Sequence, residues 1–492
     1  MAPRYPGLFQ VNTRVRLAEL SAELGRPATL DDVPDAELER LKQDGFDLVW
    51  LLGVWQTGEA ARGVSRSNQE WLEEYRRVLP DFREADVCGS CFAIQDYRVH
   101  ADFGGDAALA RLRGRLRKRG LRLILDFVPN HVAPDHPWVA AHPEFFVAGS
   151  EERLAAEPRN WVRVGGGGKS RILAYGRDPY FAGWPDTLQL NYGAPALQEA
   201  MRGELLRIAR QCDGVRCDMA MLVLPEVFQR TWGLEARPFW PAATAAVRAA
   251  VPGFLFLAEV YWDLEWTLQE QGFDYTYDKR LYDRLGEGHA RPVREHLLAG
   301  LDFQDRLARF LENHDEPRAA AAFSPDVHRA AAVITFLAPG LRFLHQGQRE
   351  GRRVRIPVHL GRGPAEAPDA ALGAFYEALL ACLREPAYRD GGWQLLEARS
   401  AWDGNPTWDD FLVFAWTGPE ERRRLVAVNY SGHQSQCRVT PPWSDLPGRT
   451  WRLADRLGPA VYDRAGDELA GPGLFLDLPP WGYHAFEVLP CS

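Results

Sequence analysis

The stretch "GVRCDMAML", residues 214–222, is an apolar run that carries an arginine and an aspartate two residues apart. In an extended strand the side chains alternate between two faces, so Arg216 and Asp218 point to one side and their apolar neighbours to the other. Charged side chains seldom face the inside of a protein unless they are paired or take part in chemistry. On its own, the stretch leaves two interpretations open: a buried structural ion pair and a catalytic site.

Outward from this strand, apolar strand-like runs alternate with runs of helical spacing. Eight strands are predicted, over residues 7–17, 46–55, 121–132, 214–220, 253–262, 273–278, 306–316 and 340–348. The main helical stretches are predicted over residues 35–45, 106–120, 194–213 and 239–251. Strands that alternate with helices in this way predict an α/β fold, a parallel (β/α)8 TIM barrel.

Two regions depart from this alternation and suggest further domains. A long irregular stretch rich in Gly, Pro and Trp follows the third strand, and short strands without intervening helices fill the last hundred residues. Short strands bounded by turn residues are typical of an antiparallel β-sandwich. We therefore predict a barrel from 1–132 and 192–385, an inserted loop-rich domain B from 133–191, and a C-terminal β-sandwich from 386–492.

Composition and charge exclude several classes of protein. The 492 residues are 46% hydrophobic and 25% charged, and the net charge of −9 argues against a nucleic acid or an anionic membrane as the main partner. The first residues show no signal-peptide pattern, and no apolar run is long enough to span a membrane. Seven scattered cysteines suit free thiols in a reducing compartment. These features predict a cytoplasmic protein and leave its oligomeric state open.

Acidic residues stand where four of the predicted strands end. They are Asp126, Asp218, Glu259 and Asp315, on the third, fourth, fifth and seventh strands. In a TIM barrel the catalytic residues lie at the C-terminal ends of the strands, so these four side chains would meet at one opening. A set of four makes the purely structural interpretation of Arg216 and Asp218 a minor one.

Glycoside hydrolysis is the chemistry that such a set of carboxylates favours. One carboxylate attacks the anomeric carbon or directs water, and a second carboxyl group protonates the leaving oxygen. An arginine beside a carboxylate keeps it ionised, which suits Asp218 next to Arg216 as the nucleophile. An apolar setting keeps a carboxyl group protonated near neutral pH, which suits Glu259 as the acid.

Four short segments resemble those of the α-amylase superfamily, glycoside hydrolase family 13. The segments are "DFVPNH" (126–131), "GVRCDMA" (214–220), "AEVYW" (258–262) and "ENHDEPR" (312–318), in the order and on the strands that the family has. The resemblance covers essentially the whole chain and implies the fold of barrel, insertion and sandwich. It also implies a retaining α-glycosidase-type enzyme.

The resemblance implies a role for each matching residue. Asp218 would be the nucleophile, Glu259 the general acid/base, and Asp315 a third carboxylate that binds sugar hydroxyls and helps to distort the ring. The implied substrate-binding residues are His131 and His314 on the sugar, Arg216 orienting the nucleophile, Asp126 bracing Arg216, and Phe92 at the position of a stacking tyrosine.

One departure from the family concerns metal and substrate. Many amylases carry a Lys-His pair three and four residues after the nucleophile, where this chain has Met221 and Leu222. That pair serves the leaving-group side and a calcium site, so we expect no metal and no cofactor here. The expected substrate is a short oligosaccharide, a disaccharide or a small glucoside rather than starch.

Three alternatives remain open from the sequence. With a sugar or another hydroxyl compound as acceptor, the same residues would make a transferase or isomerase. A non-catalytic, sugar-binding member of the superfamily would bind without turnover. A barrel enzyme acting on phosphorylated sugars would need a phosphate cradle near the last strands, and the basic residues of "LHQGQREGRR" (344–353) would then have to face the opening.

Overall fold

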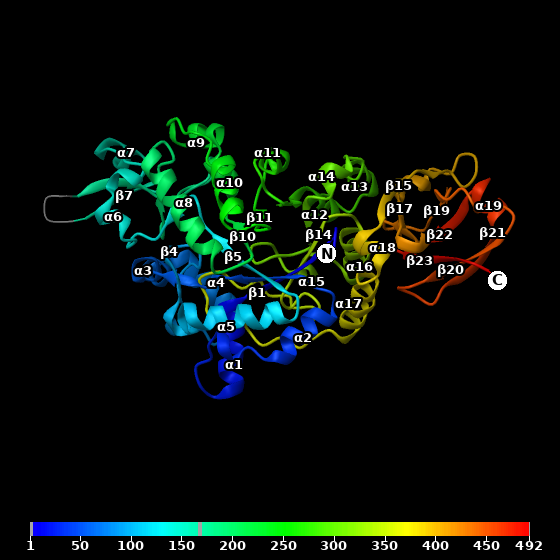
Figure 1. Cartoon of the computed structure of the whole chain (residues 1–492), viewed down its shortest axis with the longest axis horizontal. Helices are drawn as coiled ribbons and strands as arrows, with labels where there is room; N and C mark the ends of the chain where they lie inside the picture. The colour runs from blue at the N-terminus through cyan, green and yellow to red at the C-terminus, as the bar shows by residue number, and fades with distance from the viewer. Residues whose placement is uncertain (1–2, 166–169, 492) are drawn as a thin grey trace.

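The computed structural model, which describes residues 3–165 and 170–491, contains a closed barrel of eight parallel strands (Figure 1). The order around the barrel is β1-β14-β13-β12-β11-β10-β5-β2. The strands are β1 (Gly7–Asn12), β2 (Leu48–Leu52), β5 (Arg122–Phe127), β10 (Gly214–Cys217), β11 (Leu255–Ala258), β12 (Tyr275–Tyr277), β13 (Leu307–Arg309) and β14 (Leu341–His345). Each predicted run contains one of them, which confirms the TIM barrel.

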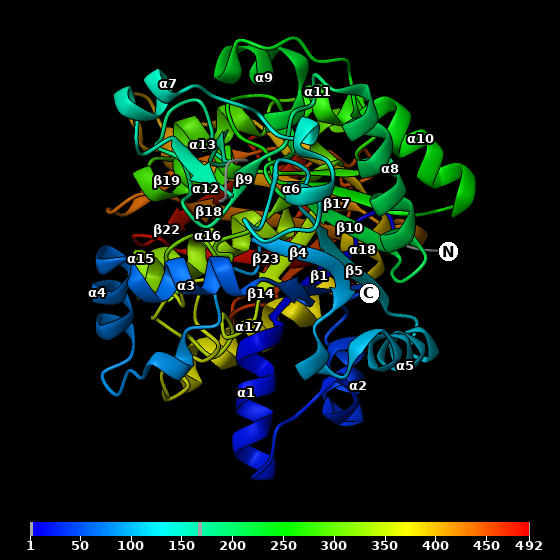
Figure 2. The same ribbon diagram turned by 90° about the vertical axis from the view of Figure 1, so that its left-hand side faces the viewer.

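Helices surround the strands on all sides (Figure 2). The longer ones are α1 (Thr13–Leu24), α2 (Asp35–Gln43), α3 (Glu59–Ser67), α4 (Gln69–Val78), α5 (Gly105–Lys118), α8 (Pro195–Ala209), α9 (Pro225–Trp232), α10 (Trp240–Ala250), α12 (Lys279–Glu287), α16 (Pro325–Leu337) and α17 (Ala370–Leu383). The shorter ones are α11 (Glu265–Glu270), α13 (Ala290–His296), α14 (Leu301–Gln304), α15 (Ala319–Ala322) and α18 (Pro386–Asp390). All four helical stretches predicted from the sequence are helices.

The first predicted strand was too long. The strand β1 ends at Asn12, and α1 begins at the next residue, because the Asn12 side chain accepts a hydrogen bond from the Val15 backbone N–H. An asparagine in this position satisfies one of the free N–H groups of the first helical turn.

The insertion after β5 contains short strands as well as loops. Its elements are β6 (His131–Val132), α6 (Trp138–Ala141), α7 (Glu151–Ala156), β7 (Trp161–Val164), β8 (Arg171–Ala174) and β9 (Leu188–Gln189). The strands pair as β6 with β9 and β7 with β8, both antiparallel. A further antiparallel pair, β3 (Trp55–Thr57) with β4 (Ile94–Val99), follows β2, with α3 and α4 between its two strands, and was not predicted.

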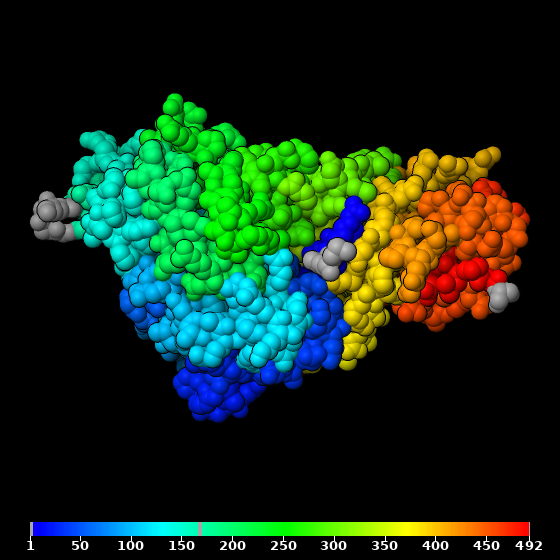
Figure 3. Space-filling view, in the orientation of Figure 1, coloured from blue at the N-terminus to red at the C-terminus, as the bar shows by residue number. Residues whose placement is uncertain are grey.

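Antiparallel sheets form the C-terminal region, which is a lobe at one end of the molecule in Figure 3. One sheet has the order β15-β17-β18-β23-β20-β21 and the other β16-β19-β22. The strands are β15 (Gly392–Leu396), β16 (Ala398–Arg399), β17 (Phe411–Thr417), β18 (Arg423–Asn429), β19 (Ser435–Val439), β20 (Thr450–Asp455), β21 (Val461–Ala465), β22 (Leu474–Leu478) and β23 (Tyr483–Pro490), with the short helix α19 (Gly466–Ala470).

The central strands β17 and β18 of the six-stranded sheet are buried on both faces. One face, with Val413 and Leu425, packs against Cys437 of the smaller sheet. The other face carries Trp416, which belongs to the core of the barrel and donates its indole N–H to the Leu337 carbonyl at 2.9 Å. The antiparallel sandwich is therefore confirmed, whereas the division of the chain at residues 132, 191 and 385 stays a prediction.

Two further features of the chain are visible in the described residues. All seven cysteines are free thiols. None of the helices within residues 3–165 and 170–491 combines the length and the apolar character that crossing a bilayer requires.

Candidate active site

The backbone of three neighbouring barrel strands brings the nucleophile and acid candidates together. Arg216 on β10 pairs in register with Asp126 on β5 and with Leu257 on β11. Asp218 donates its backbone N–H to the Phe127 carbonyl, one position beyond the regular pairing. Both carboxyl groups therefore start from adjacent strand ends, as the sequence predicts.

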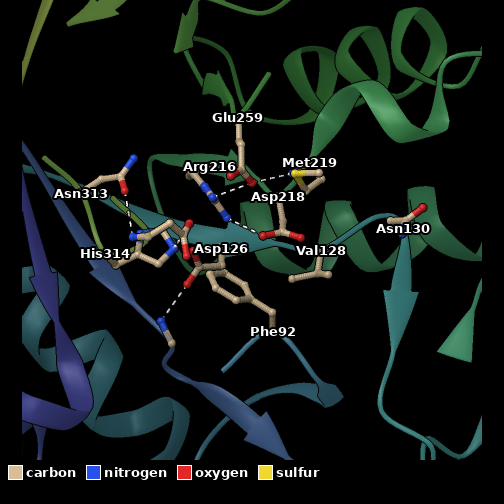
Figure 4. Close-up of polar contacts among 12 residues, drawn as sticks. Phe92, Asp126, Val128, Asn130, Arg216, Asp218, Met219, Glu259, Asn313 and His314 are labelled. Carbon is tan, nitrogen blue, oxygen red and sulfur yellow. Dashed lines mark hydrogen bonds and ion pairs between the residues drawn. The ribbon is translucent and has the colours of Figure 1, made fainter. Parts of the chain in front are cut away.

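A single buried arginine joins the two carboxylates. Arg216 Nη1 lies 2.7 Å from Asp218 Oδ1, and Nη2 lies 2.6 Å from Glu259 Oε2 (Figure 4). The Arg216 side chain is completely buried. The guanidinium also faces the rings of Trp50, Phe92 and Tyr277 at 5.2, 5.2 and 5.7 Å. Aromatic rings around a cation exclude water and strengthen its interactions with nearby anions.

Glu259 sits in a setting that suits a proton donor. Oε2 accepts a hydrogen bond from the Met219 backbone N–H and Oε1 accepts one from the Tyr261 hydroxyl, both at 2.8 Å. Burial raises the pKa of Glu259 to about 7, with Arg216 opposing and the charge of Asp218 adding to the rise. Near neutral pH this carboxyl group can therefore hold a proton and release it.

Met219 holds an unusual backbone conformation to reach Glu259. Its φ is +42°, in the left-handed region that residues other than glycine rarely adopt. Such a conformation persists only where the surrounding structure enforces it, and it is found often at functional sites. Here it directs the Met219 N–H at the Glu259 carboxylate.

The third carboxylate is the most acidic of the three. Asp315 Oδ2 lies 3.0 Å from His314 Nε2, and the His314 Nδ1 atom lies 2.9 Å from the Gln10 side-chain amide. Burial alone would raise the pKa of Asp315, but His314, Arg216 and Arg355 outweigh it and lower the pKa to about 2. Between about pH 2 and pH 7 Asp315 is therefore ionised while Glu259 is still mostly protonated.

Asp126 supports the site in a way that differs from the prediction. Its carboxylate accepts hydrogen bonds from the Trp50 indole at 3.0 Å and from the Gly53 N–H at 2.7 Å, while the ion pairs of Arg216 go to the other two carboxylates. Burial raises the pKa of Asp126, and the nearby charge of Arg216 opposes the rise. Asp126 thus contacts the Trp50 ring that faces the Arg216 guanidinium, and no direct ion pair joins it to Arg216 within the described residues.

The remaining two predicted residues lie in different surroundings. The Phe92 ring lies 5.4 Å from the His314 ring, so it faces the site. His131, at the start of β6, contacts the Trp184 ring at 5.2 Å, and burial lowers its pKa to about 4, so its imidazole is neutral. The contacts that the structure gives for His131 are with Trp184 and Asn130 rather than with the three carboxylates.

Sequence reasoning missed several residues of the site. Tyr261, two residues after Glu259, could have been found from strand alternation, because residues two apart in an extended segment share a face. Trp50 and Tyr277 could not, since buried aromatic residues are common at any position of a core. Tyr277 accepts a hydrogen bond from Arg216 Nε at 3.3 Å.

The residues near the nucleophile do not fit a calcium site. Met221 and Leu222 are buried apolar side chains. In the part of the chain that the structure describes, no three His, Cys, Asp or Glu side chains are grouped so that they could hold a metal ion.

Comparisons with known proteins complete the description of the site. Residues 36–281, half of the chain, match the family model described as "Alpha amylase, catalytic domain". Alpha-amylase 3 of Dictyoglomus thermophilum is 21% identical over 59% of this chain and 59% of its own length. The oligo-1,6-glucosidase of Parageobacillus thermoglucosidasius is 22% identical over 65% of this chain and 61% of its own length.

The structural comparison covers more of the chain than the sequence comparison does. The crystal structure of a maltogenic alpha-amylase, AmyB, from Thermotoga neapolitana has a TM-score of 0.70 and 17% identity, and the match covers 99% of both chains. This likeness concerns the fold. The chain spans about three fifths of the length of these two curated relatives.

Proposed function

Because this chain belongs to the α-amylase family, we propose that it is a retaining glycoside hydrolase that cleaves an α-glucosidic bond. The proposed substrate is a short oligosaccharide or a small glucoside. The observation that carries the proposal is the buried Arg216, which binds Asp218 and Glu259 at the same time. Two carboxylates on one guanidinium fit the spacing of about 5–5.5 Å of retaining enzymes better than the wider spacing of inverting ones.

In the first step Asp218 attacks the anomeric carbon while Glu259 gives its proton to the leaving oxygen. Burial raises the pKa of both carboxyl groups, to about 7 for Glu259, and Arg216 opposes the rise at each of them. Asp218 also accepts a hydrogen bond from Arg216, which favours its ionised form, so the proposal assigns it the role of nucleophile and Glu259 the role of acid.

In the second step Glu259 takes a proton from the acceptor, and the product keeps its α configuration. The charge of Asp218 is one cause of the raised pKa of Glu259. That charge disappears when Asp218 forms its bond to the sugar, so the pKa of Glu259 falls and the group turns from acid to base. Asp315, ionised throughout, and His314 would hold the sugar hydroxyls.

Transfer to a second sugar or another hydroxyl compound is the second candidate function. An aromatic cluster three residues beyond Glu259 favours it: the Trp262 ring lies 5.0 Å from the ring of Tyr180, and the Arg230 guanidinium lies over both. Tyr180 and its neighbour Phe181 are exposed, so they offer an apolar platform of the kind on which a sugar acceptor stacks.

Product analysis tests the proposal. The enzyme would be incubated with maltose, maltotriose, isomaltose, trehalose, sucrose and an aryl α-glucoside, and the products and their anomeric configuration followed by NMR. Free α-glucose from one linkage supports hydrolysis, and new glycosides with little free glucose support transfer or isomerisation. Sugar binding without any turnover would instead favour the non-catalytic alternative.

We expect Asp218→Asn to lower kcat by at least a thousandfold while leaving the melting temperature within a few degrees, because only the nucleophile is lost. Asp326→Asn is the matched control, since this aspartate is exposed on α16. Normal turnover by Asp218→Asn would refute the assignment of the nucleophile.

A further inference from the structure

A pocket of about 660 Å³ opens between α1, the start of α3 and the segment that precedes α5. It is lined by residues from 14–28, 56–62 and 100–103 together with Cys88 and Gly361, and we call it the α1 pocket. The three carboxylates assigned to the reaction are not among its lining residues. Its volume lies in the range of about 300–1,000 Å³ that is typical of small-molecule sites. The α1 pocket can therefore hold a small ligand outside the proposed catalytic site.

The Arg14 side chain brings a buried positive charge to the α1 pocket. It is only 7% exposed, and its hydrogen bonds go to the Gly89 carbonyl, to Cys88 Sγ at 3.1 Å and to the Thr57 hydroxyl at 3.2 Å. Cys88 Sγ donates to the His359 carbonyl at 3.2 Å, so this sulfur carries its proton. All three acceptors are therefore neutral, and no ion pair forms at Arg14 within the described part of the chain. Buried charges are normally paired, so this one favours an anionic ligand.

Two of the N–H donors of Arg14 have no acceptor among the described residues. A guanidinium has five N–H donors, and the three hydrogen bonds use both donors of Nη1 and one of Nη2. The Nε atom bonds to no described residue and is not sealed off from solvent. Nε and Nη2 form one edge of the guanidinium, and such an edge matches the two oxygens of a carboxylate.

A second buried arginine shows that this arrangement is not a general feature of the protein. Arg342 also lacks an ion pair within the described residues, but its Nε, Nη1 and Nη2 atoms all donate to backbone carbonyls. Its charge is thus surrounded by protein on every edge. Arg14 differs because its Nε edge is free and because it lines a pocket.

The charges at the rim of the α1 pocket favour a ligand with a single negative charge. Glu59 and Asp102 are exposed carboxylates, and Glu59 accepts a hydrogen bond from Arg62 at 3.0 Å. Burial lowers the pKa of His100, Asp102 opposes the fall and Arg14 adds to it, so the imidazole is neutral near pH 7. The two rim carboxylates would repel a dianion such as a phosphate monoester, whereas one negative charge balances Arg14.

The remaining walls of the pocket suit a hydroxylated carbon chain. The His100 and Phe103 rings lie 5.0 Å apart on one side, and Leu17 and Ala18 of α1 add apolar surface. Hydroxyl groups can donate to the carboxylates at the rim, which are acceptors only. Apolar and aromatic walls with a few polar groups are typical of sites that bind small molecules.

The segment 88–92 contacts both the α1 pocket and the proposed catalytic site. Gly89 and Cys88 accept hydrogen bonds from Arg14, and the Phe92 ring lies 5.2 Å from the Arg216 guanidinium. The two sites are therefore neighbours, but their lining residues differ. A ligand in the α1 pocket would not touch the reacting atoms.

We propose that the α1 pocket is a second ligand site, which binds a small hydroxylated carboxylic acid of the sugar-acid class. Its carboxylate would pair with the Nε edge of Arg14, and its hydroxyl groups would donate to Glu59 and Asp102. Charge-assisted, two-point contacts of this kind are the strongest that arginine makes with small anions. The site does not depend on the proposed function, because none of its contacts involves the three catalytic carboxylates.

Calorimetric titration of the full chain tests the site with two probes, D-gluconate and D-glucuronate. Each probe is compared with its uncharged counterpart, sorbitol or glucose. We expect the wild type to bind at least one probe tenfold or more tightly than its counterpart, and Arg14→Gln to weaken this binding at least tenfold. Arg77→Gln is the matched control, since it removes the same charge from an exposed position on α4 and should leave the affinity unchanged.

A second variant keeps the test decisive if Arg14→Gln folds poorly. Ala18→Trp places a large side chain in the pocket from a half-exposed position on α1 and removes no polar group. It should abolish binding of the probe. The melting temperature and circular dichroism of both variants show whether the fold is intact.

Four outcomes would overturn the inference. Failure of both probes to bind would refute the sugar-acid site, and binding no tighter than that of sorbitol and glucose would refute carboxylate recognition. Tighter binding of inorganic phosphate would replace the monoanion with a dianion. Binding that survives in both Arg14→Gln and Ala18→Trp would place the ligand elsewhere, for example in the catalytic site. Because calorimetry requires no turnover, these outcomes leave the proposed function untouched.

Discussion

Arg216 is the residue on which the proposed chemistry depends. It is fully buried, and within the described part of the chain its ion pairs are with the two carboxylates that would carry out the reaction. This arginine binds two acids, each at the end of a different barrel strand. The pair of charges in residues 214–222 therefore fits the proposed chemistry.

The protonation of Glu259 should set the alkaline limit of activity. A general acid must carry its proton, so kcat/KM should fall as the pH rises through about 7, the pKa of this group. The Tyr261 hydroxyl donates to the carboxylate and stabilises its ionised form, so Tyr261→Phe should raise that pKa and move the alkaline limit upward by up to about one unit. The measurement is a pH profile of kcat/KM with an aryl glucoside.

Tyr462→Phe is the control for this profile, because Tyr462 lies exposed in the C-terminal sheet. An alkaline limit that stays in place in Tyr261→Phe would mean that another group governs it.

At the scale of single residues the sequence predicts the acidic residues of the site better than it predicts the residues that contact them. Asp218, Glu259 and Asp315 stand at strand ends, where barrel geometry alone predicts that they meet. The partner of Asp126 could not be predicted, because the Trp50 indole reaches it from a strand whose register the sequence does not fix. The hydrogen bond from the Met219 N–H to Glu259 could not be predicted either. A left-handed backbone at a methionine follows from tertiary packing rather than from residue preference.

At the scale of elements the eight strands were predictable, and their ends were not. Apolar runs identify buried strands, but the first run continued into α1 because helix and strand share apolar residues at this junction. Asn12, which caps the N-terminus of α1, could have indicated where the strand ends and the helix begins. The β3–β4 pair was not predicted because polar residues interrupt the apolar pattern of β4.

The strand β10 can be tested through its first residue. A Cβ atom added at Gly214 would lie 2.7 Å from the Leu255 carbonyl oxygen of the neighbouring strand, and backbone cannot move away as a side chain can. Gly214→Ala should therefore destabilise the protein by about 1–3 kcal/mol. Urea unfolding followed by circular dichroism measures the change.

The comparison variant is Gly203→Ala in α8, where the added methyl group meets no atom within 4 Å. This change should stabilise the protein by roughly 0.5–1 kcal/mol, because alanine favours a helix interior more than glycine does. Equal effects of the two substitutions would contradict the close packing of β10 against β11.

At the scale of the whole molecule, one face of the six-stranded sheet of the sandwich belongs to the core of the barrel. The strand β17 is apolar on both faces, which is typical of a strand buried on both sides. The sandwich itself was predicted from its short strands, but its close packing on the barrel was not, since composition does not reveal which partner covers the second face.

This shared core makes a prediction about unfolding. Trp416→Ala should lower stability by about 3–5 kcal/mol, because it empties a buried site and leaves the Leu337 carbonyl without its donor. Calorimetry should still show one transition for the whole chain. Trp402→Ala, at a position that is 55% exposed, should change stability by less than about 0.5 kcal/mol. Two separate transitions in the wild type would contradict a common core.

Barrel closure also has a consequence for the synthesis of the protein. Gly7 of β1 pairs with Arg342 of β14, a residue that the ribosome adds 335 positions later. At about 5–20 residues per second, the first strand waits roughly 20–70 s for this partner. Throughout that time β1 has a free edge that can pair with a neighbouring nascent chain. The yield of native protein should therefore depend on protection by chaperones during translation more than on the stability of the finished barrel.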